Sequence, residues 1–206
     1  MDVIGCAQRL DALGFMPGKS GNVSVRTERG FLITPAALPY ATLTPEDLVE
    51  CGLNGVVLAG TRRPSSEWRL HEAVYAAQPE AKAVVHTHSP RATALACARR
   101  GIPALHYMIA LGGGEDIRCS DYATFGTQAL AEAAVAALTG RRACLLANHG
   151  VLALGASLAS AEALAREVEN LAGQYLALLA AGLEPELLNA SEMAEVREQF
   201  AGYGRG

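Results

Sequence analysis

Two histidines, one residue apart, stand at the end of an apolar run. His86 and His88 close the segment AVVHTH at residues 83–88. Alternate side chains of a β-strand project to the same face, so both imidazoles would point one way, about 7 Å apart along the chain. This pattern is typical of a strand that offers two nitrogens to one metal ion.

A third histidine, His149, follows the apolar run at residues 145–147 and is flanked by Asn148 and Gly150. Three histidines with one open coordination position are a common protein contribution to a catalytic zinc. A core or surface role is the alternative for any one histidine, but the repeated setting favours a metal site. Manganese and cobalt stay open, because imidazole ligands suit several divalent ions.

Glu67 is the carboxylate best placed for acid–base chemistry, within the segment PSSEW at residues 64–68. It stands at the start of a predicted helix, where the helix dipole alone would also favour a carboxylate. Ser65 and Ser66 could present hydroxyl and N–H groups to an anion, although N-capping by Ser66 is the simpler explanation. His71 lies one helical turn after Glu67, and we expect a helix-surface or packing role for it.

The elements that must position these residues mix strands and helices without a strict strand–helix–strand repeat. We expect helices at 2–13, 66–77, 90–99, 124–138, 157–180 and 191–200, and a helix start at 44–47, with Thr44 as its cap. We expect strands at 22–26, 31–34, 56–58, 82–87, 143–148 and 151–154. The pattern predicts an α/β fold with a central, largely antiparallel sheet covered by helices.

The composition suits one compact domain over residues 1–206, because 50% of the residues are hydrophobic and 18% are charged. A net charge of −4 without a basic run argues against a nucleic-acid or membrane-surface partner. We expect no transmembrane span and no signal peptide, since neither a long apolar stretch nor a basic N-terminal region is present. Five widely spaced cysteines without a CxxC motif predict reduced thiols and a cytoplasmic protein.

Seven motifs occur in order along the chain: GNVSVR at 21–26, LITP at 32–35, PSSEWR at 64–69, VVHTH at 84–88, IPALHYMIA at 102–110, YATFGT at 122–127 and NHG at 148–150. Together they resemble the class II aldolase/adducin family, most closely its bacterial L-fuculose-1-phosphate aldolases. The resemblance extends from about residue 2 to Tyr203. It implies a three-layer α/β/α domain around a mostly antiparallel central sheet.

The resemblance also implies a site. One Zn²⁺ per subunit would be held by His86, His88, His149 and Glu67. Glu67 would leave the metal when substrate binds and serve as the acid–base residue. Tyr107 resembles the tyrosine that a neighbouring subunit contributes to protonate the aldehyde oxygen.

The resemblance assigns the remaining residues to the two ends of a substrate. The phosphate would be bound by Asn22, Ser65 and Ser66, and the aldehyde side would be lined by Phe125 and Tyr203. Family aldolases are cyclic homotetramers with sites between subunits, so a homotetramer is implied here. After the Thr-Pro pair, the aldolases usually carry a hydroxyl residue and glycine, whereas this chain has Ala36 and Ala37. We therefore expect a reshaped or weaker grip on phosphate.

The implied reaction is cleavage of a ketose 1-phosphate to dihydroxyacetone phosphate and an aldehyde. L-Fuculose 1-phosphate, 5-deoxyribulose 1-phosphate and 5-methylthioribulose 1-phosphate are the candidate substrates. Zinc would stabilise the enediolate of the product, Glu67 would exchange the C3 proton and Tyr107 would protonate the alkoxide in the aldol direction. A pentulose-phosphate 4-epimerase, dehydratase or decarboxylase of the same family is the alternative. The last alternative is a non-catalytic adducin-like module. That hypothesis predicts that the metal ligands are lost.

Overall fold

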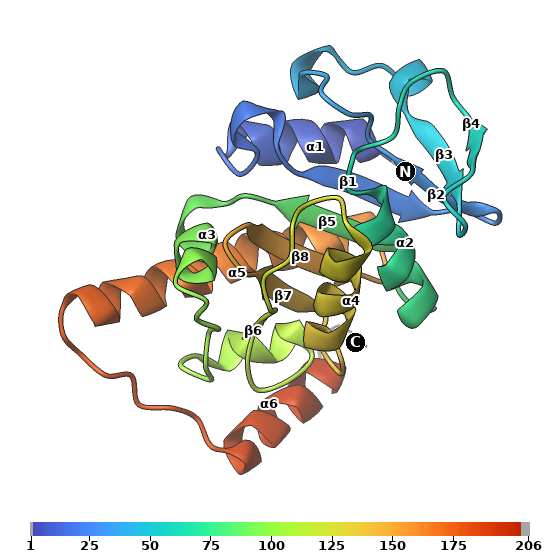
Figure 1. Ribbon diagram of the computed structural model, residues 1–206. Helices are drawn as coiled ribbons and strands as arrows, with labels where there is room; N and C mark the ends of the chain where they lie inside the picture. The colour runs from blue at the N-terminus through green and yellow to red at the C-terminus, as the bar shows by residue number, and fades with distance from the viewer. Residues whose placement is uncertain (1, 203–206) are drawn as a thin grey trace.

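One eight-stranded sheet organises the protein in a computed structural model that describes residues 2–202 (Figure 1). The strand order is β4-β3-β2-β1-β5-β8-β7-β6. Neighbouring strands run antiparallel except β6 and β7, which are parallel, so the mostly antiparallel sheet is confirmed. The strands are β1 (Asn22–Arg26), β2 (Gly30–Ile33), β3 (Val49–Gly52), β4 (Val57–Ala59), β5 (Ala83–Thr87), β6 (Arg118–Cys119), β7 (Ala143–Leu146) and β8 (Gly150–Gly155).

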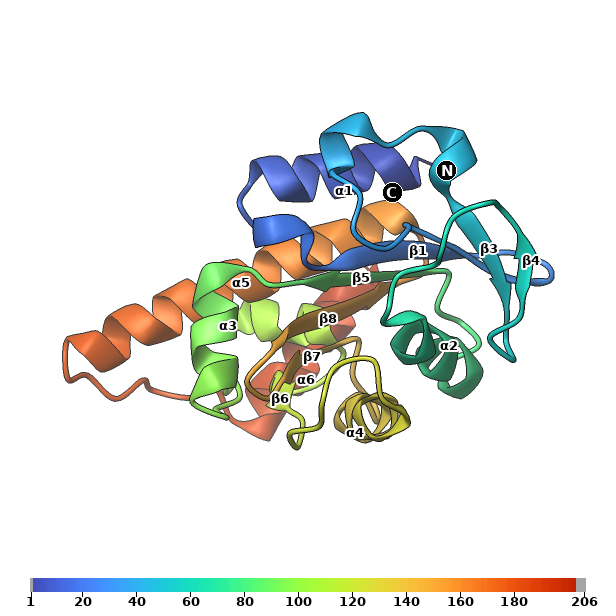
Figure 2. The same cartoon turned by 45° about the horizontal axis from the view of Figure 1, so that its top comes forward.

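Helices cover both faces of this sheet, which Figure 2 shows nearly edge-on. One hydrophobic cluster joins the sheet to α1 (Val3–Ala12), α3 (Pro90–Cys97) and α5 (Leu158–Ala180). A second cluster on the opposite face joins it to α2 (Trp68–Ala77) and α4 (Gln128–Ala137). The three-layer α/β/α architecture is therefore confirmed.

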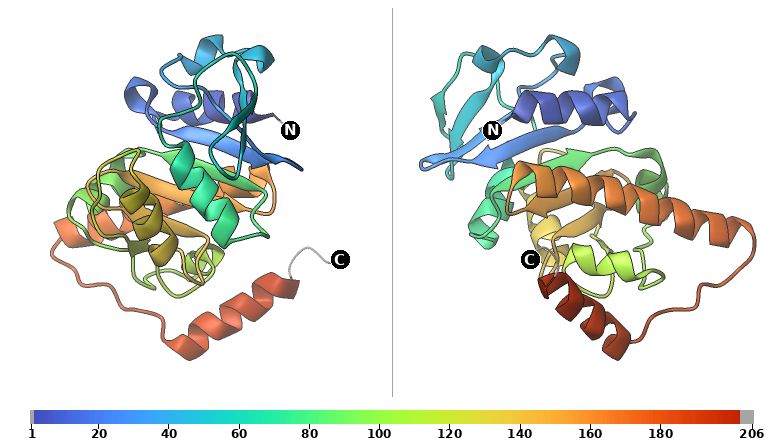
Figure 3. Two further views of the ribbon diagram at one scale, coloured as in Figure 1. Left: turned by 45° about the vertical axis from the view of Figure 1, so that its right-hand side comes forward. Right: turned by 180° about the vertical axis from the view of Figure 1, so that it is seen from behind.

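The C-terminal helix α6 (Ala190–Gly202) follows an extended segment after α5 and lies beside the 3₁₀ helix η4 (Tyr107–Gly112) (Figure 3). Met193 of α6 and Ile109 of η4 belong to the same hydrophobic cluster as α5. None of the helices within residues 2–202 combines the length and the hydropathy that a bilayer crossing needs.

The central strand β5 explains where the paired histidines point. All five of its residues are buried, as expected for a strand covered on both faces. Val85 packs in the cluster with α1 and α5, whereas Val84 packs in the cluster with α2 and α4. Because side chains alternate along a strand, His86 shares the face of Val84. The sheet thereby directs His86 toward the layer that contains α2.

The helix start expected at Thr44 is found, but the helix does not continue beyond one turn. The capping interaction does form, since the backbone N and Oγ1 of Thr44 both lie 3.0 Å from Oδ2 of Asp47. It closes only a single 3₁₀ turn, η3 (Pro45–Asp47), after which the chain extends into β3. Pairing of β3 with β2 and β4 satisfies the backbone groups that a longer helix would have bonded internally.

Candidate functional site

The four side chains expected to bind metal converge on one point. The candidate ligand atoms of Glu67, His86, His88 and His149 all lie within 4.8 Å of one another. Nε2 of His86 is 3.0 Å from Nε2 of His88 and 3.1 Å from Oε2 of Glu67. Nε2 of His149 is 3.2 Å from Oε1 of Glu67. Three separate sequence motifs therefore contribute side chains to one compact cluster.

The β7–β8 turn delivers His149 to the histidine pair at the end of β5. Asn148 in this turn has a φ of 54°, in the left-handed region that reverses the chain tightly. Gly150 then opens β8 against the end of β5. A Cβ at Gly150 would lie only 2.4 Å from the carbonyl oxygen of Thr87 and 3.0 Å from Cδ2 of His88. The close approach of the two strands therefore requires glycine at this position.

The hydrogen bonding of the cluster leaves lone pairs facing its centre. Nδ1 of His86 donates to the carbonyl oxygen of Val151 at 2.8 Å, which places the proton on Nδ1 and leaves Nε2 as the inward atom. Oε1 of Glu67 is buried and has no hydrogen-bond partner among the described residues. Imidazole and carboxylate lone pairs at such short range repel one another unless a cation or proton lies between them. The donor set fits a divalent transition metal such as zinc.

Burial sets the protonation of the two outer histidines. Burial, together with the neighbouring His86, lowers the pKa of His88 to about 3 and the pKa of His149 to about 4. Both rings are therefore neutral at pH 7, which is the form that binds metal ions.

Glu67 and His86 form a tightly coupled pair. Burial alone would raise the pKa of Glu67, but His86, His149 and Asn22 outweigh it and hold that pKa well below its usual range. Burial alone would lower the pKa of His86, but the Glu67 carboxylate outweighs it and raises that pKa. Glu67 is therefore ionised at pH 7, which is the form that binds a cation.

The start of α2 aims Glu67 at the histidines. The expectation that Ser66 caps this helix was wrong, because Glu67 itself occupies the N-cap position and its side chain makes no capping bond. Oγ of Ser65 instead accepts a hydrogen bond from the backbone N–H of Glu67 at 3.3 Å. Because its side chain makes no capping bond, the Glu67 carboxyl is free to face the cluster.

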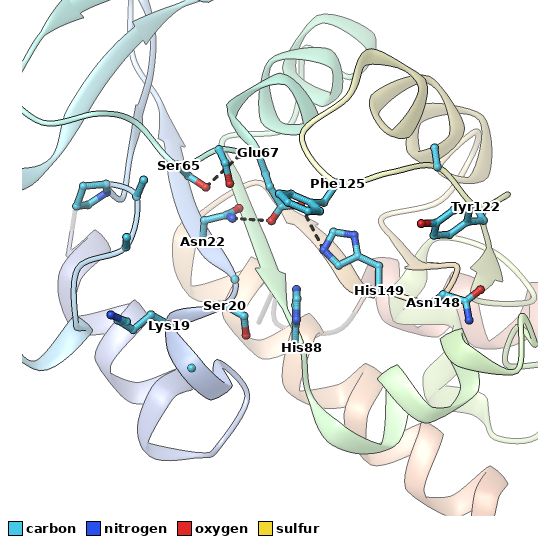
Figure 4. Close-up of a pocket in the computed structure, with 17 residues that line it drawn as sticks. Lys19, Ser20, Asn22, Ser65, Glu67, His88, Tyr122, Phe125, Asn148 and His149 are labelled. Atoms are coloured by element: carbon cyan, nitrogen blue, oxygen red, sulfur yellow. Dashed lines mark hydrogen bonds and ion pairs between the residues drawn. The ribbon is translucent and has the colours of Figure 1, made fainter.

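A cavity of about 600 Å³ opens beside the cluster (Figure 4). Glu67, His88 and His149 form part of its wall. The expected substrate residues Asn22, Ser65, Ser66 and Phe125 also line it, as do Ala36 and Ala37. In Figure 4, Lys19 and Ser20 lie on the opposite side of His88 from Tyr122 and Asn148. The cavity thus has two ends with the histidine and carboxylate groups between them.

Tyr107, an expected site residue, does not line this cavity within the described part of one chain. Tyr107 lies on η4 with half of its surface exposed, and its ring stacks on His106 and Phe200 at centroid distances of 4.7 and 6.2 Å. It lines a separate groove beside α6. Tyr203 lies outside the described residues.

Three further residues line the cavity although the sequence predicts no role for them: Lys19, Tyr122 and Asn148. Tyr122 and Asn148 belong to the YATFGT and NHG motifs, whereas none of the motifs includes Lys19. Lys19 has a φ of 68°, which is uncommon for a residue other than glycine and often marks a functional turn. The surface alternative for His71 was wrong, because this ring is fully buried and hydrogen-bonded to Ser24 and Asn22.

Comparison with known proteins identifies the family of this chain. Residues 1–176 match the class II aldolase and adducin N-terminal domain. The chain belongs to this family. Both the resemblance read from the motifs and the fold that it implied are therefore confirmed.

Similar proteins cover nearly the whole chain. A 5-methylthioribulose-1-phosphate/5-deoxyribulose-1-phosphate aldolase of Rhodospirillum rubrum is 50% identical over 98% of this chain and 90% of its own length. An L-fuculose phosphate aldolase of Escherichia coli (strain K12) is 46% identical over 98% of this chain and 94% of its own. A solved structure of an L-fuculose 1-phosphate aldolase aligns with a TM-score of 0.93 at 39% identity, over 97% of this chain and 94% of that one.

Proposed function

We propose that this protein is a zinc-dependent class II aldolase that cleaves a ketose 1-phosphate into dihydroxyacetone phosphate and an aldehyde. The observation that carries the proposal is the convergence of three imidazoles and one buried carboxylate, of which Glu67, His88 and His149 line a cavity. The names of the similar aldolases support the substrate class, which includes L-fuculose, 5-deoxyribulose and 5-methylthioribulose 1-phosphates.

Zinc would be held by His86, His88 and His149, with Glu67 as a carboxylate ligand that substrate oxygens can replace. When bound, the ion would supply Lewis-acid chemistry that stabilises negative charge on the substrate oxygens. The unpartnered Oε1 of Glu67 supports this arrangement, because a buried carboxylate oxygen without a donor is costly unless a cation is near.

Glu67 would move the proton at C3. In the aldol direction its carboxylate removes a C3 proton from dihydroxyacetone phosphate, and C3 then bonds to the aldehyde carbon. The aldehyde oxygen takes its proton from the hydroxyl of Tyr107 of a neighbouring subunit. Cleavage is the reverse: the C3–C4 bond breaks, the C4 hydroxyl proton returns to Tyr107, and C3 regains a proton from Glu67.

The phosphate would occupy the end of the cavity formed by Asn22, Ser65, Ser66 and Lys19. The ammonium group of Lys19 forms no ion pair among residues 2–202, so it is available to an anion. We infer that this charge offsets the hydroxyl missing at Ala36. Phe125 and Tyr203 would line the aldehyde end.

The functional assembly would be a homotetramer with active sites between its subunits, in each of which residues 1–206 form a single domain. The half-exposed Tyr107 and Phe125, which is 66% exposed, support this assembly, since both are large aromatic side chains that a partner could cover. Five free cysteines support a location in the reducing cytoplasm.

Release of dihydroxyacetone phosphate from the zinc-loaded protein tests the proposal. L-Fuculose 1-phosphate, 5-deoxyribulose 1-phosphate and 5-methylthioribulose 1-phosphate should be compared side by side, with and without a chelator. We expect release that the chelator abolishes, and the ranking identifies the substrate. No release from any of the three would contradict the aldolase and favour an epimerase, dehydratase or decarboxylase reaction.

A further inference from the structure

A chain of buried polar side chains leads from the interior of the protein to Glu67. The hydroxyl of Tyr75 is 2.8 Å from Oγ of Ser24, and that Oγ is 2.6 Å from Nδ1 of His71. Nε2 of His71 makes a short hydrogen bond to Oδ1 of Asn22, and Nδ2 of Asn22 donates to Oε2 of Glu67 at 3.0 Å. All five residues are at least 95% buried.

This series of hydrogen-bonded side chains forms where β1 packs against α2. Asn22 and Ser24 are two residues apart on β1, so both project to one face of the sheet. His71 and Tyr75 are four residues apart on α2, so they share one side of that helix. Asn22, Ser24, His71 and Tyr75 therefore all lie on regular secondary structure, with no loop residue among them.

The Glu67 carboxylate, at the end of the series, sets the donor and acceptor of every hydrogen bond in it. An ionised carboxylate only accepts, so Asn22 must turn its NH₂ group toward Glu67 and its Oδ1 toward His71. His71 must then carry its proton on Nε2, and its Nδ1 accepts from the hydroxyl of Ser24. Burial lowers the pKa of His71 to about 3, so the ring keeps a single neutral form at physiological pH.

We propose that His71 is a positioning residue that holds the amide of Asn22 with its N–H groups toward Glu67 and the phosphate end of the cavity. Nδ2 has two hydrogens: one is donated to Glu67, and the second is available to a bound phosphate. An amide turned the other way would present Oδ1 to two anions at once. The inference rests on the proposed function, because it assumes that the cavity binds a ketose 1-phosphate.

His71→Phe and His71→Gln form the test pair. Phenylalanine keeps an aromatic ring beside Phe31 but removes both hydrogen bonds, whereas glutamine can still donate to Oδ1 of Asn22. Inorganic phosphate serves as the probe, measured as a competitive inhibitor of the zinc-loaded enzyme and by calorimetric titration. We expect His71→Phe to weaken phosphate binding about tenfold, the effect of losing one charge-assisted hydrogen bond, and His71→Gln to restore most of it. Zinc content should be unchanged in both.

A double-mutant cycle separates positioning from general support of the fold. Asn22→Ala should weaken phosphate binding at least as much as His71→Phe, and combining the two should add nothing further. Phe31→Leu is the matched control, since it disturbs the ring stack and should lower thermal stability without changing phosphate affinity. Nitrogen-15 NMR of the metal-free protein should find the His71 proton on Nε2.

Three outcomes would overturn the role of His71. They are wild-type phosphate affinity in His71→Phe, fully additive losses in the cycle, and a His71 proton on Nδ1. Failure of the proposed function is a separate result, because it would appear as no ketose cleavage by the wild-type protein. The phosphate titration and the NMR experiment would still test His71 in that case.

Discussion

At the scale of single residues, the two carboxylate oxygens of Glu67 have different surroundings. Oε2 is held by Asn22 and lies near His86, whereas Oε1 faces His149 and has no donor among residues 2–202. One oxygen is therefore anchored while the other is free to hold a cation or a proton. That asymmetry suits a group that binds metal at rest and carries a proton during turnover.

Glu67→Gln removes the base but keeps the shape of the side chain. We expect the rate of C3 proton exchange in dihydroxyacetone phosphate to fall by about 10²- to 10⁴-fold, since general acid–base catalysis contributes that much. Deuterium exchange followed by NMR measures it. Glu72→Gln on the same helix is the control and should exchange at the wild-type rate. Unchanged exchange in the Glu67 variant would remove this residue from the role.

The two lysines of the chain form a matched pair for the phosphate end. Lys19 lines the cavity, whereas Lys82 is exposed and does not. We expect Lys19→Met to raise the KM for a ketose 1-phosphate about tenfold, because a charge-assisted contact to phosphate is lost. Lys82→Met should leave KM unchanged. Equal KM values for both variants would place the phosphate elsewhere.

At the scale of elements, the approach of the β7–β8 turn to the end of β5 is the tightest constraint on the site. We expect Gly150→Ala to lower zinc content and to destabilise the fold by about 1–3 kcal/mol, because the added Cβ overlaps the carbonyl of Thr87 and crowds His88. Metal analysis and chemical denaturation measure the two effects.

Gly140→Ala separates crowding from backbone strain. Gly140 has a φ of 68°, and a Cβ at this position would meet no other atom of residues 2–202 within 4 Å. Its replacement by alanine should therefore cost about 1 kcal/mol of stability but retain zinc. Full zinc content in Gly150→Ala would show that the turn has more freedom than the structure indicates.

The sequence predicts an element well where its hydrophobic pattern is long. It predicts an element poorly where strand pairing alone defines the element. The helix at 157–180 is found as α5, with Ser157 as its cap. The strand β6 has two residues and no periodicity, so only its pairing with β7 defines it. Thr44 has the capping chemistry of a helix start, yet the helix ends after one turn because the residues that follow pair as β3.

The metal cluster is predictable because histidine spacing on a strand has a direct geometric meaning. His86 and His88 share a face by periodicity alone, whereas the meeting of His149 and Glu67 with them depends on sheet order. The burial of His71 depends on the packing of α2 on β1, which no local pattern contains. The part played by Lys19 depends on the conformation of a turn.

At the scale of the whole molecule, Tyr107 lies outside the cavity of its own chain. If a neighbouring subunit supplies it, two inactive variants should complement each other. We expect Glu67→Gln and Tyr107→Phe subunits to be nearly inactive alone, and a co-refolded equal mixture to regain activity at about a quarter of its sites. A catalytic assay on the mixture measures this. No recovery from properly mixed oligomers would mean that both residues act within one chain.

Acid should destabilise the metal-free protein through His71. The pKa of this ring is about 3 when folded against an ordinary value of 6.5. Between these values the unfolded chain binds a proton that the folded chain does not, so the free energy of unfolding falls as pH falls, by up to about 1.4 kcal/mol per pH unit. Denaturation of wild-type protein and His71→Gln at several pH values tests it. Equal slopes for the two proteins would contradict a neutral His71.

The four candidate ligands come from three distant places in the chain: the start of α2, the end of β5 and the β7–β8 turn. An ion bound there would tie residues 67 and 149 together across the sheet, and binding to the folded form alone shifts the folding equilibrium toward it. Metal-free chains would open more often and meet proteases in that open state. The zinc supply of the cell would then govern how long each molecule survives, as well as how fast it works.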